Sequence, residues 1–514
     1  MKNQHKAGVI LSYTSEAIKI LSSLLYTPIM LRLLGRSEYG LYQLVYSFVA
    51  YLGLLSFGFT ASYIRFYSIY KKNDDKEQIS RLNGMFLTIF CVIATIAIIC
   101  GAVMILNIHA IFGTKLTESE YGTAKILMTL MVFNLAISFP NSVFTCITSA
   151  HEQFFFQRLL VVLNNLLNPF LSLPLLLMGY GSIGMVAVTT VITISKFSVN
   201  IWFVLVKLKE RFIFNNFDFS LLGNIWKFTF FIFLNQIIDQ VNWSVDKFLL
   251  GRMMGTTAVA IYGLGGQINT MYVTFSSSIS SVFVPRVNKL VVESNDDHKI
   301  SLLFTRIGRI QFMVLSLIMT GFIFFGKPFM RIWGGEGFED SYYVALWLII
   351  PVTVPLIQNL GIEVQRAKNK HQARSIVYFL IAIGNVFLSI PLIRYLGPVG
   401  AAIGTAVSLF LGNGLFMNWY YANRIGIEIK NFWKSIFTFV PAFIAPVAFG
   451  IVIKNFIQIK GIVRLLVWAV LYGTVYFVSM WILGMNDSEK KLITNMFGKL
   501  KESFAQRDKE QPSK

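Results

Sequence analysis

The chain has 514 residues, of which 55% are hydrophobic and only 14% are charged, and its mean hydropathy is +0.62. A soluble protein of this length could not hide so much apolar surface, which excludes a soluble enzyme and a soluble nucleic-acid-binding domain. The net charge of +20 is therefore assigned to basic loops and a basic tail beside anionic lipid.

Apolar runs of about 20 residues, the length that a helix needs to cross a bilayer, recur along nearly the whole chain. The runs are continuous rather than alternating, which predicts helices and not a barrel. The first six spans are expected near residues 8–31, 40–63, 83–107, 124–148, 157–178 and 183–206. A second six are expected near 226–250, 258–284, 302–325, 342–365, 375–396 and 398–421, and a last pair near 434–454 and 463–484. The chain is thus predicted to be an all-α integral membrane protein with about 14 transmembrane helices.

Basic residues alternate in density between successive connections. With the N-terminus inside, about 31 lysines and arginines fall on one side of the membrane and roughly ten on the other. The dense side includes the connections near 71–81, 207–211 and 366–374, and the tail from Lys490 to Lys514. Because basic residues concentrate in cytoplasmic loops, we expect both termini to be cytoplasmic.

The sequence repeats itself at a spacing of about 216 residues. The echoes pair Leu33-Leu34-Gly35-Arg36 with Leu249-Leu250-Gly251-Arg252, Asn168–Leu175 with Asn385–Leu392, and Gly181-Ser182-Ile183-Gly184 with Gly397-Pro398-Val399-Gly400. Each repeat would hold six helices, an even number, so both copies enter the membrane in the same direction. We therefore expect two parallel six-helix repeats that form two lobes with a cleft between them, followed by a C-terminal helix pair.

These elements divide the chain into five parts. We expect an N-terminal lobe at 1–210, an interfacial linker at 211–225, a C-terminal lobe at 226–425, the last two transmembrane helices at 430–485 and a basic cytoplasmic tail at 486–514. Phenylalanines alternate with polar residues in the linker, a pattern compatible with a stretch lying in the inner interface and equally with a plain loop. The tail opens on a helix cap and continues with apolar residues at helical spacing.

Ionisable residues inside the predicted spans are the candidate functional residues. A charge at the centre of a bilayer costs about 2.5–3.5 kcal/mol, so it usually faces a watery cavity or a partner. Glu16 and Lys19 share one face of the first span, either as a self-neutralising pair or as cleft residues with Lys19 free to meet an anion. Lys196 lies in the sixth span with no acid near it in sequence, so it either meets an anion in the cleft or snorkels to the surface.

The seventh span is too polar to face lipid. Asn235 and Asp239 are predicted to line the cleft, and Asp239 is a candidate cation or proton site; Asp246 beside Lys247 is expected to be structural. Glu363, in the tenth span, is a second candidate for ion coupling, with a polar helix end as the alternative.

Arg65 and Arg286 occupy similar places at the inner ends of the second and eighth spans. They either flank the inner mouth of the cleft or serve as ordinary positive-inside anchors. No Walker-type glycine loop and no histidine–cysteine cluster occurs in the sequence, so we expect neither catalysis nor a metal or other cofactor.

Two stretches of the sequence carry a family resemblance. The first lobe reads Tyr26-Thr27-Pro28, then Leu33-Leu34-Gly35-Arg36 and Tyr39-Gly40-Leu41-Tyr42; the second reads Asp246-Lys247-Phe248, then Ile261-Tyr262-Gly263-Leu264 and Val284-Pro285-Arg286. Over most of its length the chain resembles the polysaccharide-transporter (oligosaccharide flippase) branch of the multidrug/oligosaccharidyl-lipid/polysaccharide exporter superfamily.

The resemblance implies a flippase of the bacterial cytoplasmic membrane. Such a protein moves undecaprenyl-pyrophosphate-linked repeat units from the inner to the outer leaflet by alternating access, for capsule, O-antigen or exopolysaccharide assembly. The cationic cavities of the family would suit Lys19 and Lys196. The implied partners are the lipid-linked oligosaccharide, membrane lipid, a polysaccharide polymerase and glycosyltransferases; no nucleic acid is expected, and the protein is expected to be a monomer.

Three alternatives stay open. A cation-coupled multidrug exporter of the same superfamily would need an acidic cavity, which Asp239 and Glu363 could provide. A lipid II flippase would share the last two helices. A non-transporting scaffold is the third alternative, against which Asp239 and Lys196 argue, because a scaffold needs no charge at mid-membrane.

Overall fold

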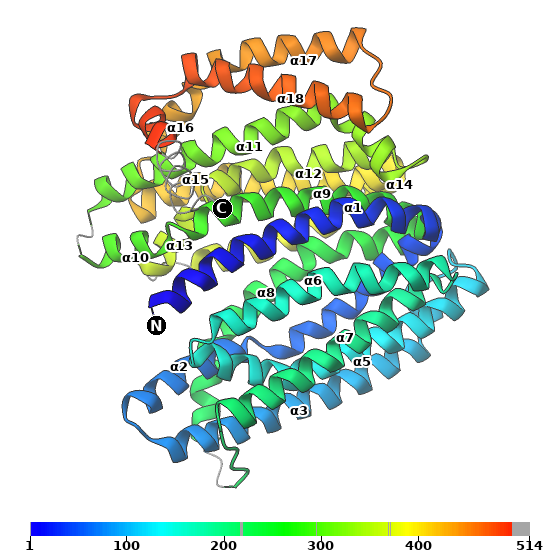
Figure 1. Cartoon of the computed structure of the whole chain (residues 1–514), viewed down its shortest axis with the longest axis vertical. Coiled ribbons are helices and arrows are strands. Elements are labelled where there is room, and N and C mark those ends of the chain that lie inside the picture. The colour runs from blue at the N-terminus through cyan, green and yellow to red at the C-terminus, as the bar shows by residue number, and fades with distance from the viewer. Residues whose placement is uncertain (1, 216–218, 294–295, 369, 371, 496–514) are drawn as a thin grey trace, which may run out of the picture. The chain divides into compact units, whose positions relative to one another are not determined.

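The computed structural model describes residues 2–215, 219–293, 296–368, 370 and 372–495, which are almost entirely helical and contain no strand (Figure 1). The first half contains α1 (Lys2–Val49), α2 (Phe59–Lys72), α3 (Lys76–Leu106), α4 (Ile108–Phe112), α5 (Glu118–Ala150), α6 (Phe154–Leu177), α7 (Gly181–Trp202) and α8 (Phe219–Met254). The second contains α9 (Thr256–Ser281), α10 (Val284–Glu293), α11 (Asp297–Gly334), α12 (Asp340–Ile357), α13 (Leu360–Ala367), α14 (Gln372–Leu409), α15 (Met417–Tyr420), α16 (Ile429–Phe437), α17 (Ile444–Phe456) and α18 (Ile462–Ser479).

Ten helical stretches of the described chain are long and apolar enough to cross a membrane, which confirms an all-α membrane protein. Two of these stretches, Thr14–Lys72 and Ala373–Ile425, contain a glycine that leaves the helical conformation, at Gly35 and Gly397. Each of the 14 predicted spans overlaps a helix, and the number of crossings rests on that prediction.

One pair of echoed glycines has nearly the same positive φ in both repeats. Gly181 has φ +57° and Gly397 has φ +59°, in the left-handed region that favours glycine. Gly181 begins α7, and Gly397 separates the two helical parts of α14. This echo therefore marks a tight turn between consecutive helices in each repeat.

A second echoed pair, Gly35 and Gly251, differs in the structure. Gly35 interrupts α1 with φ +73°, whereas α8 runs through Gly251 and the turn comes at Gly255, with φ +89°. The turn of the second repeat therefore comes four residues after the echoed glycine. A Cβ atom at Gly251 would lie 2.5 Å from the Leu44 side chain, so glycine there allows α8 to pack closely against α1.

The chain forms two compact units. Unit 1 comprises Met1–Met271, Trp333–Leu348 and Gln372–Gly412; unit 2 comprises Tyr272–Ile332, Ile349–His371 and Asn413–Lys514. Because the units are assembled from interleaved segments, they do not correspond to the five parts expected from the sequence. Those five parts stay a prediction.

Unit 1 has an apolar interior and an apolar surface. Leu44, Phe112 and Leu127 are fully buried in one of its cores, where α1, α4 and α5 meet. Helix α3 lies beside α5 (Figure 1). Its Val92 and Ile99 side chains are instead exposed. Large apolar side chains on the outer face of a helix are expected where lipid replaces water as the solvent.

Turns predicted to lie on the same side of the membrane meet at the same end of unit 1. At one end, Thr256 donates a hydrogen bond to Glu120 at 2.8 Å, and the backbone N–H of Ser182 donates to Glu38 at 2.6 Å. These residues all lie in or beside turns of the side predicted to be poor in basic residues. The alternation of the predicted spans therefore agrees with the packing of unit 1.

Unit 2 has a separate core between α11, α17 and α18. Phe439 and Met480 are fully buried there, and Tyr472 is 1% exposed. α17 and α18 pack against each other, as expected for a terminal helix pair (Figure 1). After α18 the chain passes Gly484 and begins a further helix at Asp487.

Candidate functional site

The polar face of α1 contacts a helix of the second repeat within unit 1. Glu16, Lys19, Ser23 and Thr27 follow one another at intervals of three or four residues and so share this face. Gln267 of α9 donates from Nε2 to the Ser23 hydroxyl at 2.6 Å and to the Thr27 hydroxyl at 2.9 Å. The face that carries the predicted residues is therefore directed toward the second repeat rather than toward lipid.

Glu16 and Lys19 do not form the ion pair that was one of the two interpretations. The Lys19 side chain is exposed, and the Oε2 atom of Glu16 is buried without a hydrogen-bond partner in the described chain. Lys19 is thus available to an anion. That Lys19 shares a cavity with Lys196 stays a prediction.

Lys196 is half buried on α7, and no described residue gives it a hydrogen bond or an ion pair. One helical turn further along, Asn200 is 2% exposed and donates to the side-chain oxygen of Asn141 on α5 at 2.7 Å. Lys196 therefore lies one helical turn before a polar contact between α7 and α5. Its charge has no protein counter-charge among the described residues.

The polar residues predicted on the seventh span lie on α8. The Asp239 side chain is exposed, and the side chain of Asn235 lies outside the described ones. Three residues before Asp239 on the same helix, Gln236 has a buried Oε1 atom that accepts no hydrogen bond from the described residues. Unsatisfied buried polar atoms in a membrane helix usually indicate contact with water.

Asp246, which was expected to be structural beside Lys247, belongs to a cluster of oxygen atoms in the structure. It is 2% exposed, and its Oδ2 accepts hydrogen bonds from the Tyr262 hydroxyl at 2.6 Å and the Thr405 hydroxyl at 2.7 Å. The Ser389 hydroxyl lies beside this carboxylate and donates to Asn385 at 3.3 Å. Helices α8, α9 and α14 thus supply one carboxylate, three hydroxyls and one amide.

Such a donor set suits a hard cation or a proton, because hard cations prefer oxygen ligands. Lys247 does not neutralise Asp246 but donates to Gln43 of α1 at 2.9 Å. The echo of Asn168–Leu175 in Asn385–Leu392 was the signal in the sequence, since it includes Asn385 and Ser389. It could not show that Asp246 lies beside them.

The remaining predicted residues lie on the short helices α2, α10 and α13. Arg65 on α2 and Arg286 on α10 both have exposed side chains, and the Arg65 guanidinium lies 6.0 Å from the centre of the Phe66 ring. Arg65 belongs to unit 1 and Arg286 to unit 2. Glu363 on α13 forms an ion pair with Arg366 at 2.9 Å, which favours the polar helix end that was left as its alternative.

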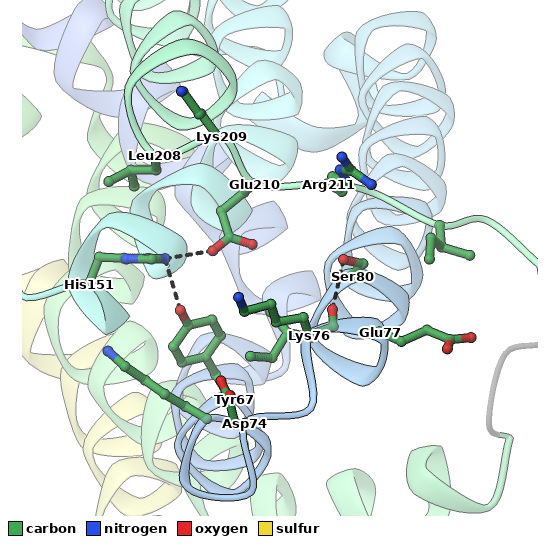
Figure 2. Close-up of a pocket in the computed structure, with 13 residues that line it drawn as sticks. Tyr67, Asp74, Lys76, Glu77, Ser80, His151, Leu208, Lys209, Glu210 and Arg211 are labelled. Atoms are coloured by element: carbon green, nitrogen blue, oxygen red, sulfur yellow. Dashed lines mark hydrogen bonds and ion pairs between the residues drawn. The ribbon is translucent and has the colours of Figure 1, made fainter.

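A second polar site, which the sequence did not indicate, lies at the basic end of unit 1 (Figure 2). The His151 Nε2 atom lies 2.7 Å from Oε1 of Glu210 and 2.8 Å from the Tyr67 hydroxyl. Since an ionised carboxylate only accepts, Nε2 carries a proton and donates to Glu210. The other carboxylate oxygen, Oε2, accepts from Asn83 at 3.0 Å.

The same contacts fix the segment that follows α7. Asn83 also donates to the Arg211 carbonyl at 3.1 Å, and the Ile213 N–H donates to the Ser80 carbonyl at 3.0 Å. A Cβ atom at Gly84 would lie 2.0 Å from the Ile213 carbonyl oxygen, so only glycine permits this approach. Residues 208–215, which include the start of the predicted linker, therefore form a non-helical strap on α3. The interfacial position of the linker stays a prediction.

Comparison with known proteins adds to this geometry. The family described as "Polysaccharide biosynthesis protein" matches residues 6–291, more than half of the chain. A protein of Shigella flexneri named "Putative O-antigen transporter" is 19% identical over 400 residues, which cover 77% of this chain and 92% of that protein.

Solved structures show the same fold at low sequence identity. A structure of the lipid II flippase MurJ in an inward closed conformation aligns with a TM-score of 0.71 and 16% identity, over 92% of this chain and 98% of that one. An inward-facing multidrug resistance MATE transporter of the MOP superfamily aligns with a TM-score of 0.63 and 13% identity, over 82% and 96%. These proteins are transporters, in agreement with the expectation that the chain is not an enzyme.

Proposed function

The chain belongs to the polysaccharide biosynthesis protein family, and from that premise we propose that it is a flippase for a lipid-linked oligosaccharide. Its cargo would be an undecaprenyl-pyrophosphate-linked repeat unit, moved from the inner to the outer leaflet of the cytoplasmic membrane. The name of the Shigella flexneri relative and the fold shared with a lipid II flippase support a glycolipid cargo. Parallel repeats support alternating access by rocking of one lobe against the other.

Lys196 is the observation that carries this proposal. A half-buried cation in a membrane helix, without a counter-charge among the described residues, is costly unless it meets an anion or water. The pyrophosphate of the cargo is such an anion. The exposed Lys19, on the α1 face directed toward the second repeat, offers a second cation for the same group.

The membrane potential favours this direction of transport. Moving one negative charge outward across an inside-negative membrane gains about 2.3 kcal/mol per 100 mV. A pyrophosphate with two charges would gain roughly twice that amount. We therefore propose that the potential alone can drive the cargo outward, without ATP.

The test is flipping of a fluorescent undecaprenyl-pyrophosphate oligosaccharide by the purified protein in proteoliposomes, with and without an imposed potential. We expect faster flipping when the side of the liposome membrane that corresponds to the cytoplasm is negative. Absence of flipping under every gradient, together with export of an organic cation, would replace the proposal with the multidrug exporter. Flipping of lipid II alone would replace it with the lipid II flippase.

A second driving force is favoured by one specific observation, the oxygen cluster around Asp246. We propose this buried carboxylate, rather than the exposed Asp239 or the paired Glu363, as the coupling site for a cation or proton. A cation held by α8, α9 and α14 would bias how these helices pack, and so the state of the transporter.

Asp246→Asn is expected to abolish the acceleration of flipping by a sodium or proton gradient, because the substituted amide cannot balance a cation's charge. Flipping driven by the potential alone should persist. The measurement is the initial flipping rate with each gradient imposed separately. Asp239→Asn is the matched control, and loss of the gradient response in that variant but not in Asp246→Asn would return the coupling site to Asp239.

A further inference from the structure

Unit 1 has a pocket of about 710 Å³ at its basic end, outside the polar face of α1 and the Asp246 cluster (Figure 2). Its walls are the end of α2, the start of α3, the end of α5 and residues 208–213 of the strap. The strap is fixed by the Glu210 contacts with His151 and Asn83, so this wall is preformed. A pocket of this volume suits a ligand the size of a head group.

The carboxylates of the pocket are largely engaged by the protein. Both oxygens of Glu210 accept hydrogen bonds, from His151 and Asn83. Glu77 forms an ion pair with Arg81 at 2.5 Å. The third carboxylate of the pocket, Asp74, has no side-chain partner among the described residues.

Cations outnumber that one available carboxylate. Lys71, Lys76, Lys209 and Arg211 all line the pocket and all have exposed side chains. Lys71 makes a long 3.4 Å contact to the Ala150 carbonyl, and no described acid pairs with the other three. The pocket therefore has several N–H donors available to an anion and a net positive field.

The pocket also borders the apolar surface of the unit. Ile69 lies two residues before Lys71 and is 45% exposed, and Phe214 directly follows the strap residue Ile213 and is 59% exposed. In a membrane protein, such side chains face acyl chains. A ligand that reaches this pocket along the membrane would thus be an amphiphile with its anionic group among the lysines.

We propose that this pocket binds the phosphate group of an anionic membrane lipid at the basic surface of the protein. The cations supply charge-assisted hydrogen bonds to the phosphate oxygens, as expected for lysine and arginine. The apolar residues beside the strap accommodate the start of the lipid chains. The bound lipid would bridge α2, α3 and the strap, and so hold the connection between the two repeats.

The test compares variants of the full-length protein in detergent, titrated with a fluorescent phosphatidylglycerol. Lys71→Gln/Lys76→Gln/Arg211→Gln should weaken binding by about tenfold or more, since each basic residue near a lipid surface contributes appreciably. Lys430→Gln/Lys434→Gln/Lys454→Gln removes the same charge from exposed positions of unit 2 and should leave this binding unchanged. Phosphatidylcholine should bind weakly to all three proteins.

A variant that is expected to bind more tightly separates a loss of the site from misfolding, because a misfolded protein would not gain affinity. Asp74 has φ +53°, a conformation that asparagine tolerates, so Asp74→Asn removes the free carboxylate without changing the backbone. It should tighten phosphatidylglycerol binding by roughly two- to fivefold. Unchanged binding in both this variant and the triple variant would overturn the site. Binding of inorganic pyrophosphate in place of the lipid would overturn the lipid as its ligand, and neither result depends on flipping activity.

Discussion

Lys196→Gln is expected to slow flipping of the pyrophosphate-linked oligosaccharide by about 10- to 100-fold at subsaturating cargo. A hydrogen bond to a charged group contributes about 1.5–3 kcal/mol, and each 1.4 kcal/mol is a factor of ten. Because Lys196 has no acid beside it in the described chain, its substitution removes a charge for the cargo rather than an internal ion pair. The measurement is the initial flipping rate in proteoliposomes under a fixed potential.

Two further variants separate charge from packing. Lys196→Arg keeps the cation and should retain most of the activity, whereas Lys125→Gln removes an exposed cation from α5 and should have little effect. Lys19→Gln should slow flipping less than Lys196→Gln, since the exposed Lys19 is better solvated. Equal flipping by the native and Lys196→Gln proteins would reject this residue as a cargo contact while leaving the flippase assignment intact.

Glu489→Ala is expected to lower the free energy of unfolding by about 3–5 kcal/mol, the usual cost of leaving a buried charge without its partner. Arg309 on α11 is 6% exposed and donates from Nε and Nη2 to the two carboxylate oxygens of Glu489 at 2.6 and 2.9 Å. Arg309 also donates to Thr438 at 2.7 Å and to the Gly484 carbonyl at 3.1 Å. The pair thus fastens the start of the C-terminal tail to the core of unit 2.

The double variant Arg309→Met/Glu489→Leu should recover a large part of that loss, because no unpaired charge is then buried. The measurement is the free energy of unfolding of the native protein, Glu489→Ala and the double variant, in mixed micelles with increasing amounts of a denaturing detergent. Glu77→Ala breaks an exposed ion pair and is the control, with an expected loss of at most about 1 kcal/mol. A double variant less stable than Glu489→Ala would show that Arg309 stabilises the core through its other hydrogen bonds.

The candidate site was predictable only in part. The polar face of α1 could be read from the spacing of Glu16 and Lys19. The structure directs that face toward α9, where Gln267 donates to Ser23. The role of Asp246 could not be read, because its partners Tyr262 and Thr405 lie 16 and 159 residues away along the chain. Its neighbour in the sequence, Lys247, donates to Gln43 rather than to Asp246.

The sequence by itself determined the helical membrane fold, the internal repeat and the segregation of basic residues to one set of connections. These features follow from composition, periodicity and charge, which act locally along a helix and at its ends. Only the tertiary structure decided which polar groups meet: His151 with Glu210, 59 residues apart, and Arg309 with Glu489, 180 residues apart. It also decided that Gly251 serves close packing and Gly255 the turn. An apolar segment in lipid must form a helix wherever it stands in the chain. Which other helix it packs against depends on close packing and on the hydrogen bonds that its buried polar groups require.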